Sequence, residues 1–339
     1  MYQFKNDYSE LACEEIMQAL MKYFNEQNIA YGLDKHSENA ERLILEKFNS
    51  KNGKVFFLNG GTQTNTVFIS YVLRPYEAVI SLETGHINVH ETGSVEASGH
   101  KIITVKGKNG KIYPRDIEKV ILEFNNEHTV KPKMVYISNS TEIGTIYNKE
   151  ELVNLKTICD KYHLYFFIDG ARLGSALTSK ENDVNPEILG EICDAFYVGG
   201  TKNGLLYGEA LLINNPDLAR DFRFHIKNRG ATLAKGYGVG IQFERAFKDD
   251  LYFSLARHTN EVASYLKEEF KKLNIKMLDS PTNQIFAFFS SPIAKKIIDN
   301  FGVEVWYQEN DIYCLRFVTS FNTTNKDVDE LIAYLKDNI

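Results

Sequence analysis

Two polar residues that could share one cofactor follow two apolar runs of the chain. Asp169 closes the run Leu164–Ile168, and Lys202 comes shortly after the run Ala195–Val198. Because the carboxyl ends of neighbouring parallel strands meet at one edge of a sheet, both side chains are expected to reach the same ligand. A lysine can form a Schiff base with an aldehyde, and a carboxylate can keep a pyridine nitrogen protonated so that the ring accepts electrons. The pair therefore predicts a site for pyridoxal phosphate (PLP).

Small residues upstream of this pair predict where the phosphate of such a cofactor binds. The run Gly61-Thr62-Gln63 follows the strand candidate Val55–Leu58 and opens a helical pattern. Backbone N–H groups and the dipole at the start of a helix favour a phosphate dianion. The same run could also be an ordinary strand-to-helix turn in which Thr62 is the N-cap.

Three further side chains could act on the cofactor or on a substrate. His86 could stack on the cofactor ring and also move protons, which an apolar ring could not do. Arg316 lies on a strand candidate, and its guanidinium could bind a carboxylate through two parallel hydrogen bonds; Arg172 is a second candidate for that carboxylate. A structural role remains the alternative for two of them: His86 could be a histidine at a helix N-terminus, and Arg316 could form an inter-domain ion pair.

The composition of the 339-residue chain argues against several classes of partner. Its formal net charge is −6 with both signs dispersed, so the basic surface that nucleic-acid binding requires is missing. The sequence shows no signal peptide and no membrane-spanning stretch, and its four cysteines lack the spacing of a metal site or a disulfide framework. We therefore expect a cytoplasmic enzyme without a metal that binds neither nucleic acid nor membranes.

Alternating strand and helix patterns predict a large α/β domain. Seven apolar strand candidates alternate with helical or irregular segments, which is typical of a mostly parallel sheet covered by helices. These candidates are Val55–Leu58, Ala78–Leu82, Lys101–Val105, Met134–Ile137, Leu164–Ile168, Ala195–Val198 and Ala210–Ile213.

Helical patterns flank this region, and the remaining chain predicts a second, smaller domain. The helical patterns run from Glu10 to about Gln27, from Asn39 to about Phe48 and from about Gly238 to Leu273. The tail contains the strand candidates Ile285–Phe289, Val303–Trp306 and Ile312–Val318, followed by a helix over Lys326–Lys336. We expect residues 1–240 to form an N-terminal segment and the large cofactor-binding domain, and residues 241–339 to form a small α+β domain.

Several motifs, in the same order along the chain, resemble the threonine aldolase branch of the β-eliminating lyase superfamily. The matching stretches are Tyr31-Gly32-Leu33-Asp34, Gly61-Thr62-Gln63-Thr64-Asn65, His86 with Glu91 and Gly93, Asp169-Gly170-Ala171-Arg172, Lys202, and Leu315-Arg316-Phe317-Val318-Thr319. The resemblance runs nearly end to end. It implies the PLP-dependent transferase fold type I, with a mostly parallel seven-stranded sheet in the large domain and a small C-terminal α+β domain.

The resemblance also implies roles for individual residues. Lys202 would hold the cofactor, Asp169 would pair with its ring nitrogen, and His86 would stack on its face. Further cofactor contacts are implied for Gly61, Thr62, Gln63, Arg172, Thr201 and Lys227, and substrate contacts for Arg172, Arg316, Tyr31 and Tyr8. Family members are homodimers or homotetramers with shared active sites, so Lys227 and Arg229 could approach the phosphate of the partner's cofactor.

The implied reaction is PLP-dependent aldol cleavage of L-threonine, or a related β-hydroxy-α-amino acid, to glycine and an aldehyde. Glu142 stands where many aldolases carry a second histidine, so His86, a water that it orders, or Glu142 could remove the β-hydroxyl proton. The stretch Asn6-Asp7-Tyr8-Ser9-Glu10 only partly resembles the start of the family. A β-eliminating lyase or an aminotransferase acting on another amino acid stays open, and so does a non-catalytic PLP-binding or regulatory protein.

Overall fold

The structure is a computed structural model that describes residues 1–338. Its larger sheet has seven strands in the order β1-β7-β6-β5-β4-β2-β3, and within the described residues β7 alone runs against the common direction. The strands are β1 (Lys54–Leu58), β2 (Glu77–Leu82), β3 (Lys101–Val105), β4 (Lys131–Ser138), β5 (Tyr165–Asp169), β6 (Ala195–Gly199) and β7 (Glu209–Ile213). The expected α/β fold with a mostly parallel seven-stranded sheet is confirmed.

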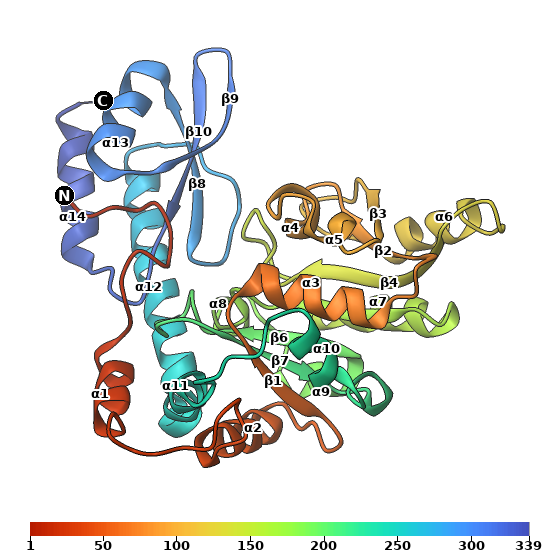
Figure 1. Ribbon diagram of the computed structural model, residues 1–339. Helices are drawn as coiled ribbons and strands as arrows, with labels where there is room; N and C mark the ends of the chain where they lie inside the picture. Colours follow the sequence, from red (N-terminus) through yellow and green to blue (C-terminus); the bar gives the residue numbers. More distant parts are fainter. Residues whose placement is uncertain (339) are drawn as a thin grey trace.

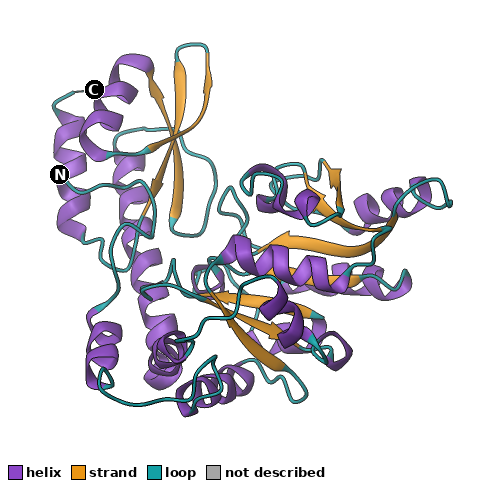
Figure 2. Ribbon diagram, viewed as in Figure 1, coloured by secondary structure: helices purple, strands orange, loops and turns teal. Residues whose placement is uncertain are grey.

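Helices lie on both faces of this sheet (Figure 2), and alternating side chains of its strands pack into a core on each face. In β4, Val135 and Ile137 point into one core, whereas Met134 and Tyr136 point into the other. Because both faces are buried, the strands consist of continuous apolar runs. The first face is covered by α2 (Lys35–Lys47), α6 (Pro114–Glu123), α7 (Lys149–Lys161), α8 (Leu173–Leu177), α9 (Pro186–Ile192) and α11 (Tyr237–Phe247). The opposite face is covered by α3 (Gly61–Val72), α4 (His86–Val89), α5 (Ser94–Ala97) and α10 (Phe222–Asn228).

A second, antiparallel sheet in the order β8-β10-β9 forms the small domain, which α12 joins to the large one (Figure 1). Its elements are β8 (Gln284–Ser290), β9 (Glu304–Glu309), β10 (Ile312–Val318), α12 (Leu251–Lys272), α13 (Ser291–Phe301) and α14 (Asn325–Lys336). Leu315 and Phe317 of β10 pack into the core between this sheet and the helices. Arg316 lies between them in sequence, so its side chain points to the opposite face, where Trp306 contacts His90 of the large domain with ring centroids 6.4 Å apart.

The N-terminal segment crosses the small domain before it joins the large one (Figure 1). Phe4 is buried in the small-domain core; its N–H donates to the carbonyl of Phe301, and its own carbonyl accepts from the N–H of Val318. The chain then continues to α1 (Glu14–Lys22). Asp7 therefore lies where the N-terminal segment leaves the small domain.

The helices before the large sheet differ from their predicted bounds. The predicted helix from Glu10 to about Gln27 is only the nine residues of α1, Glu14–Lys22. The predicted helix from Asn39 begins earlier, at Lys35, because the carboxylate of Asp34 accepts hydrogen bonds from two N–H groups of the first turn. Helix-capping chemistry therefore extended one element beyond its apolar pattern.

The predicted helix from Gly238 to Leu273 is two helices. It is interrupted after Phe247 by a 3₁₀ turn over Lys248–Asp250, in which Asp249 and Asp250 have φ values of 57° and 58°. This left-handed backbone cannot continue a right-handed helix. A second 3₁₀ turn covers Pro216–Leu218.

The predicted domain boundary at residue 240 stays a prediction. None of the helices formed by residues 1–338 combines the length and the apolar character needed to cross a membrane.

Candidate active site

Asp169 is the last residue of one strand, and Lys202 follows the end of the neighbouring parallel strand. β5 ends at Asp169 and β6 at Gly199, and the N–H of Gly199 donates to the carbonyl of Gly170 over 2.9 Å. A Cβ atom at Gly170 would lie 1.8 Å from the carbonyl oxygen of Tyr197, so a glycine is required for the two strand ends to meet. Lys202 lies in the turn that follows, between β6 and β7.

The carboxylate of Asp169 is buried and accepts four hydrogen bonds. Its Oδ1 accepts from the hydroxyl of Tyr197 (2.5 Å) and from a backbone N–H, and its Oδ2 accepts from the hydroxyl of Tyr136 (2.6 Å) and from Nδ2 of Asn65 (3.0 Å). Burial raises the pKa of Asp169, but the charge of His86 and these hydrogen bonds outweigh it, so the pKa lies below its ordinary value. The structure therefore holds a fixed anion at the end of β5.

Asn65 links Asp169 to His86. The Nδ2 group of Asn65 also donates to Oε1 of Glu91 over 2.8 Å, and the same oxygen lies 2.9 Å from Nδ1 of His86. The Glu91 side chain is completely buried, whereas that of His86 is 32% exposed. A carboxylate at Nδ1 favours the proton on that nitrogen and leaves Nε2 to accept or pass on a proton.

Glu142 lies beside His86. Its Oε1 accepts from the backbone N–H of His86 (3.0 Å) and from Oγ of Ser138 (2.6 Å), and Ser138 pairs with Asp169 across β4 and β5. Burial raises the pKa of Glu142. Its carboxyl group therefore holds a proton more readily than an exposed glutamate does, which suits a group that exchanges protons with a substrate.

Lys202 lies in a turn bordered by Tyr8 and Glu209. Its Nζ atom is 5.7 Å from the ring centroid of Tyr8, and the Glu209 carboxylate accepts from the N–H of Gly200 over 2.9 Å. The same turn is closed by Thr201, whose hydroxyl oxygen accepts from a backbone N–H over 3.1 Å. Burial lowers the pKa of Lys202, and the charge of Arg172 lowers it further. A larger fraction of neutral amine results, and the neutral amine is the form that attacks an aldehyde.

The predicted phosphate loop lines a pocket of about 520 Å³ at the start of α3. Arg229 also lines this pocket, and no atom lies within 4 Å of the position that a Cβ would take at Gly60. A Cβ at Gly61 would be 2.9 Å from the hydroxyl of Tyr197, so the loop adjoins the group that holds Asp169. An open helix N-terminus with an arginine fits a phosphate, and the ionised Asp169 fits a protonated ring nitrogen. The residues present therefore fit PLP.

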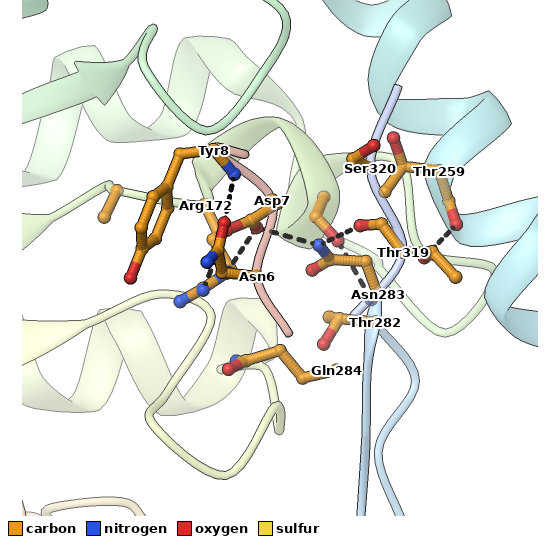
Figure 3. A network of polar contacts seen from close by, with 12 residues as sticks. Asn6, Asp7, Tyr8, Arg172, Thr259, Thr282, Asn283, Gln284, Thr319 and Ser320 are labelled. Atoms are coloured by element: carbon orange, nitrogen blue, oxygen red, sulfur yellow. Dashed lines mark hydrogen bonds and ion pairs between the residues drawn. The ribbon is translucent and has the colours of Figure 1, made fainter. Parts of the chain in front are cut away.

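Both predicted carboxylate-binding arginines face acidic side chains. Nε of Arg172 donates to Oδ2 of Asp7 (2.7 Å) and its Nη2 donates to Oδ1 (3.0 Å), as Figure 3 shows. Arg316 donates from Nη2 to Glu304 and lies 5.6 Å from the ring centroid of Trp306. The Nε atom of Arg316 is buried without a hydrogen-bond partner in the described chain. Because an unpaired buried N–H is costly, this atom marks a position where a ligand could accept.

Tyr31 and Lys227 form a separate cluster. Nζ of Lys227 lies 4.8 Å from the ring centroid of Tyr31, whose carbonyl accepts from Arg223 over 3.0 Å. Tyr31 and Arg223 line another pocket of about 250 Å³. Between residues 1 and 338, no hydrogen bond or ion pair joins this cluster to Asp169 or Lys202. Their predicted contacts with a cofactor or substrate therefore stay predictions.

The structure also adds residues for which the sequence suggested no role. Tyr136, Tyr197 and Asn65 hold Asp169, and Asp7 holds Arg172. Alternation offered a signal for the tyrosines, since Tyr136 lies on a strand beside β5 and its hydroxyl is the polar tip of an otherwise apolar run. Among the described residues, no group of three or more histidine, cysteine, aspartate or glutamate side chains could hold a metal ion.

Comparison with known proteins identifies relatives over nearly the whole length of the chain. The family model described as beta-eliminating lyase matches residues 3–291. The low-specificity L-threonine aldolase of Pseudomonas sp. (strain NCIMB 10558) is 29% identical over 338 residues, which is 98% of this chain and 97% of that protein. A solved structure of Leishmania major threonine aldolase is 40% identical, covers 99% of both chains and has a TM-score of 0.97. The aspartate aminotransferase of Thermus thermophilus shares the fold at 14% identity, with a TM-score of 0.70 over 98% of this chain and 89% of that one.

Proposed function

The chain belongs to the beta-eliminating lyase family, and on this premise we propose that it cleaves L-threonine, or a related β-hydroxy-α-amino acid, to glycine and an aldehyde with PLP as its cofactor. The observation that carries the proposal is the ionised Asp169 beside the turn of Lys202, in a chain 40% identical to a threonine aldolase structure over 99% of its length. The chemistry follows from what each side chain can hold.

When bound, PLP supplies an aldehyde carbon for attachment of an amine and a ring that takes up the electron pair released at Cα. Lys202 would hold the cofactor through its amine, and Asp169 would accept a hydrogen bond from the protonated ring nitrogen. Backbone N–H groups of Gly61 and Thr62, together with Arg229, would bind the phosphate. His86 would stack on the ring, because Glu91 fixes its imidazole through Nδ1.

Arg172 and Arg316 would bind the substrate carboxylate and so orient the amino acid. Held by both guanidinium groups, the substrate would keep one orientation in which its Cα–Cβ bond is positioned for cleavage. Glu142 or His86 would accept the β-hydroxyl proton while the Cα–Cβ bond breaks and the aldehyde leaves. A proton returned to Cα then gives glycine. All atoms of threonine are thereby recovered in glycine and acetaldehyde.

Product analysis separates this reaction from its alternatives. Purified protein loaded with PLP would be incubated with L-threonine, and glycine plus acetaldehyde would be resolved from 2-oxobutyrate plus ammonia. Glycine with acetaldehyde supports aldol cleavage, whereas oxobutyrate would identify an eliminating lyase. A requirement for a keto acid as amino acceptor would identify an aminotransferase. A PLP-loaded protein inert toward a broad amino-acid panel would contradict all three.

Lys202→Ala is expected to abolish turnover, because no other amine is proposed to hold the cofactor. The measurement is glycine formation from L-threonine by the variant, after PLP has been added in excess. Full activity of this variant would contradict the assignment of Lys202. Lys156→Ala is a suitable control, since that lysine pairs with Asp160 on the surface of α7.

The role of Glu142 makes a prediction about pH. A general base must be ionised, so kcat/KM is expected to fall as the pH drops through the pKa of Glu142, which burial raises. Glu142→Gln should lower kcat and remove this acidic limb of the profile. An unchanged acidic limb in the variant would contradict Glu142 as the base.

We further propose that active sites are shared between subunits of a homo-oligomer. Two observations support this proposal. Among residues 1–338, no hydrogen bond or ion pair joins Tyr31 or Lys227 to Asp169 or Lys202, and Tyr31 is 45% exposed. Mixing inactive Lys202→Ala subunits with Lys227→Ala subunits is expected to restore activity in hybrids, because one of their sites then carries neither substitution. The absence of any recovery would contradict shared sites.

A further inference from the structure

Asp7 is a buried acidic residue to which the reaction above assigns no role. Its side chain is fully buried, and it lies between Arg172 of the large domain and Asn283 of the small domain (Figure 3). Burial raises the pKa of Asp7, but the charges of Arg172 and Lys202 outweigh burial and bring the pKa below its ordinary value. Asp7 is therefore an anion at the junction of the two domains, close to the turn that carries Lys202.

The geometry of the pair leaves one edge of Arg172 open. A guanidinium has two edges that can each bind a carboxylate, one formed by Nε and Nη2 and the other by Nη1 and Nη2. Asp7 occupies the first edge with bonds of 2.7 Å and 3.0 Å. Nη1 makes no hydrogen bond in residues 1–338 and is not among their buried unpaired atoms, so the second edge keeps contact with solvent. A substrate carboxylate could bind there without displacing Asp7.

Asp7 also connects this arginine to the strand pair that carries Arg316. Oδ2 of Asp7 accepts from Nδ2 of Asn283 over 2.9 Å, and the same Nδ2 group donates to the carbonyl of Thr319 over 2.9 Å. Asn283 directly precedes β8 and Thr319 directly follows β10, and these strands pair along their full length. The position of Asp7 is thus fixed by the sheet that holds the second carboxylate-binding arginine.

We propose that Asp7 is a positioning residue for substrate recognition: it presents the open edge of Arg172 to the substrate carboxylate and sets that edge relative to Arg316. Asp7 touches neither substrate nor cofactor in this role and acts through Arg172 and Asn283. The inference rests on the proposed function only in that the protein binds PLP and an amino acid. It adds that binding of the ligand's carboxylate depends on Asp7, whereas binding of its amine does not.

Glycine and methylamine separate these two requirements, because both present an amine and only glycine carries a carboxylate. The full chain, loaded with PLP, would be titrated with each ligand, and the change in cofactor absorbance would give the dissociation constant. Asp7→Asn removes the negative charge that pairs with Arg172. This variant is expected to bind glycine about tenfold or more weakly and to change methylamine binding by less than about twofold. Equal weakening of both ligands, or no change in either, would overturn the proposal.

Two further variants keep the test decisive. Asn283→Ala retains the Asp7–Arg172 pair, so it remains informative if Asp7→Asn does not fold. This variant should bind glycine about threefold more weakly and methylamine with unchanged affinity. Asp250→Asn is the matched control, because it removes an aspartate that pairs with Arg257 and Lys47 away from the site. It should alter neither ligand. Asn283→Ala with an unchanged ratio of glycine to methylamine affinity would also overturn the proposal.

Turnover of threonine does not enter this measurement. A wild-type protein that binds both amines but releases no glycine from threonine would contradict the proposed function alone. The comparison of glycine with methylamine would then still decide the role of Asp7, since it depends on binding and not on bond cleavage.

Discussion

The two arginines proposed to bind the substrate carboxylate lie in regions with different constraints. Arg172 is held by a fully buried aspartate on its Nε–Nη2 edge, and that aspartate is held in turn by Asn283. Arg316 pairs with Glu304, whose side chain is 43% exposed and lies on the outer strand of the small sheet, and its own Nε is buried without a partner. One arginine is therefore fixed before a ligand arrives, whereas the other keeps an unsatisfied donor.

This difference indicates that the two arginines contribute to substrate binding in different ways. A preset group costs no reorganisation when substrate binds, because its geometry was established on folding. A group with an exposed partner can exchange that partner for a ligand, since exposed ion pairs contribute little free energy. We infer that Arg172 sets the orientation of the carboxylate, and that Arg316 changes its partner from Glu304 to the substrate.

The largest expected effect is on protein stability and concerns Arg172. Arg172→Ala leaves Asp7 as a buried anion without its ion-pair partner, and breaking a buried pair costs about 3–5 kcal/mol. Denaturant titration of the wild type and the variant would measure the free energy of unfolding. A loss below about 1 kcal/mol would show that Asp7 is not constrained as described, because that is the scale of an exposed pair.

Arg316→Ala should differ from Arg172→Ala because it affects ligand binding more than it affects protein stability. Its partner is partly exposed, so the free energy of unfolding should change by about 1 kcal/mol or less. Loss of a charged hydrogen-bond donor to the substrate should weaken glycine binding by about tenfold to a hundredfold. The comparison fails if the two arginine variants lose equal stability, or if glycine binding to Arg316→Ala is unchanged.

The Asp7–Arg172 pair should also make the stability of the protein depend on pH. Burial raises the pKa of Asp7, but Arg172 and Lys202 bring it below its ordinary value, so the ionised form is favoured by folding. A carboxyl group of this kind stabilises the protein above its unfolded pKa of about 3.9 and loses that contribution as the pH falls through its folded pKa. The stability difference between wild type and Asp7→Asn should be complete at neutral pH and shrink under acid. Unfolding titrations at stepwise lower pH would measure it, and a constant difference would contradict the assignment.

The smallest expected effect is a gain. Glu304→Gln removes the negative charge that competes with substrate for Arg316, and an exposed ion pair of about 0.2–1 kcal/mol corresponds to a KM lower by up to about fivefold. Steady-state kinetics on the productive substrate would detect it. A higher KM would instead mean that Glu304 orients Arg316 as Asp7 orients Arg172, and the contrast between the two regions would disappear.

Much of the fold could be predicted from the sequence because both faces of the large sheet are buried. Each strand is then a short apolar run, and the polar residue that follows a run, such as Asp169, marks the strand end. The helices were less predictable. Asp249 and Asp250 continue the polar face of a helical pattern, yet their left-handed backbone separates α11 from α12.

The site was predictable where it depends on local order and unpredictable where it depends on tertiary contacts. Asp169 and Lys202 follow neighbouring strands, so a rule about parallel sheets brings them together. No local pattern connects Asp7 with Arg172 or Asn283, because these residues come from three separate segments of the chain. The partners of both arginines therefore emerged only from the structure.

The bond between Asp7 and Asn283 spans 276 residues, and this separation has a consequence for biosynthesis. Asp169, Lys202 and the phosphate loop all lie before residue 230, so the ribosome makes the cofactor-binding residues first. Asn283 and Thr319 are made later, and closing a contact between such distant segments costs more conformational entropy than a local contact does. During translation, Asp7 is among the first residues of the site to be made, and it is among the last to obtain all of its partners.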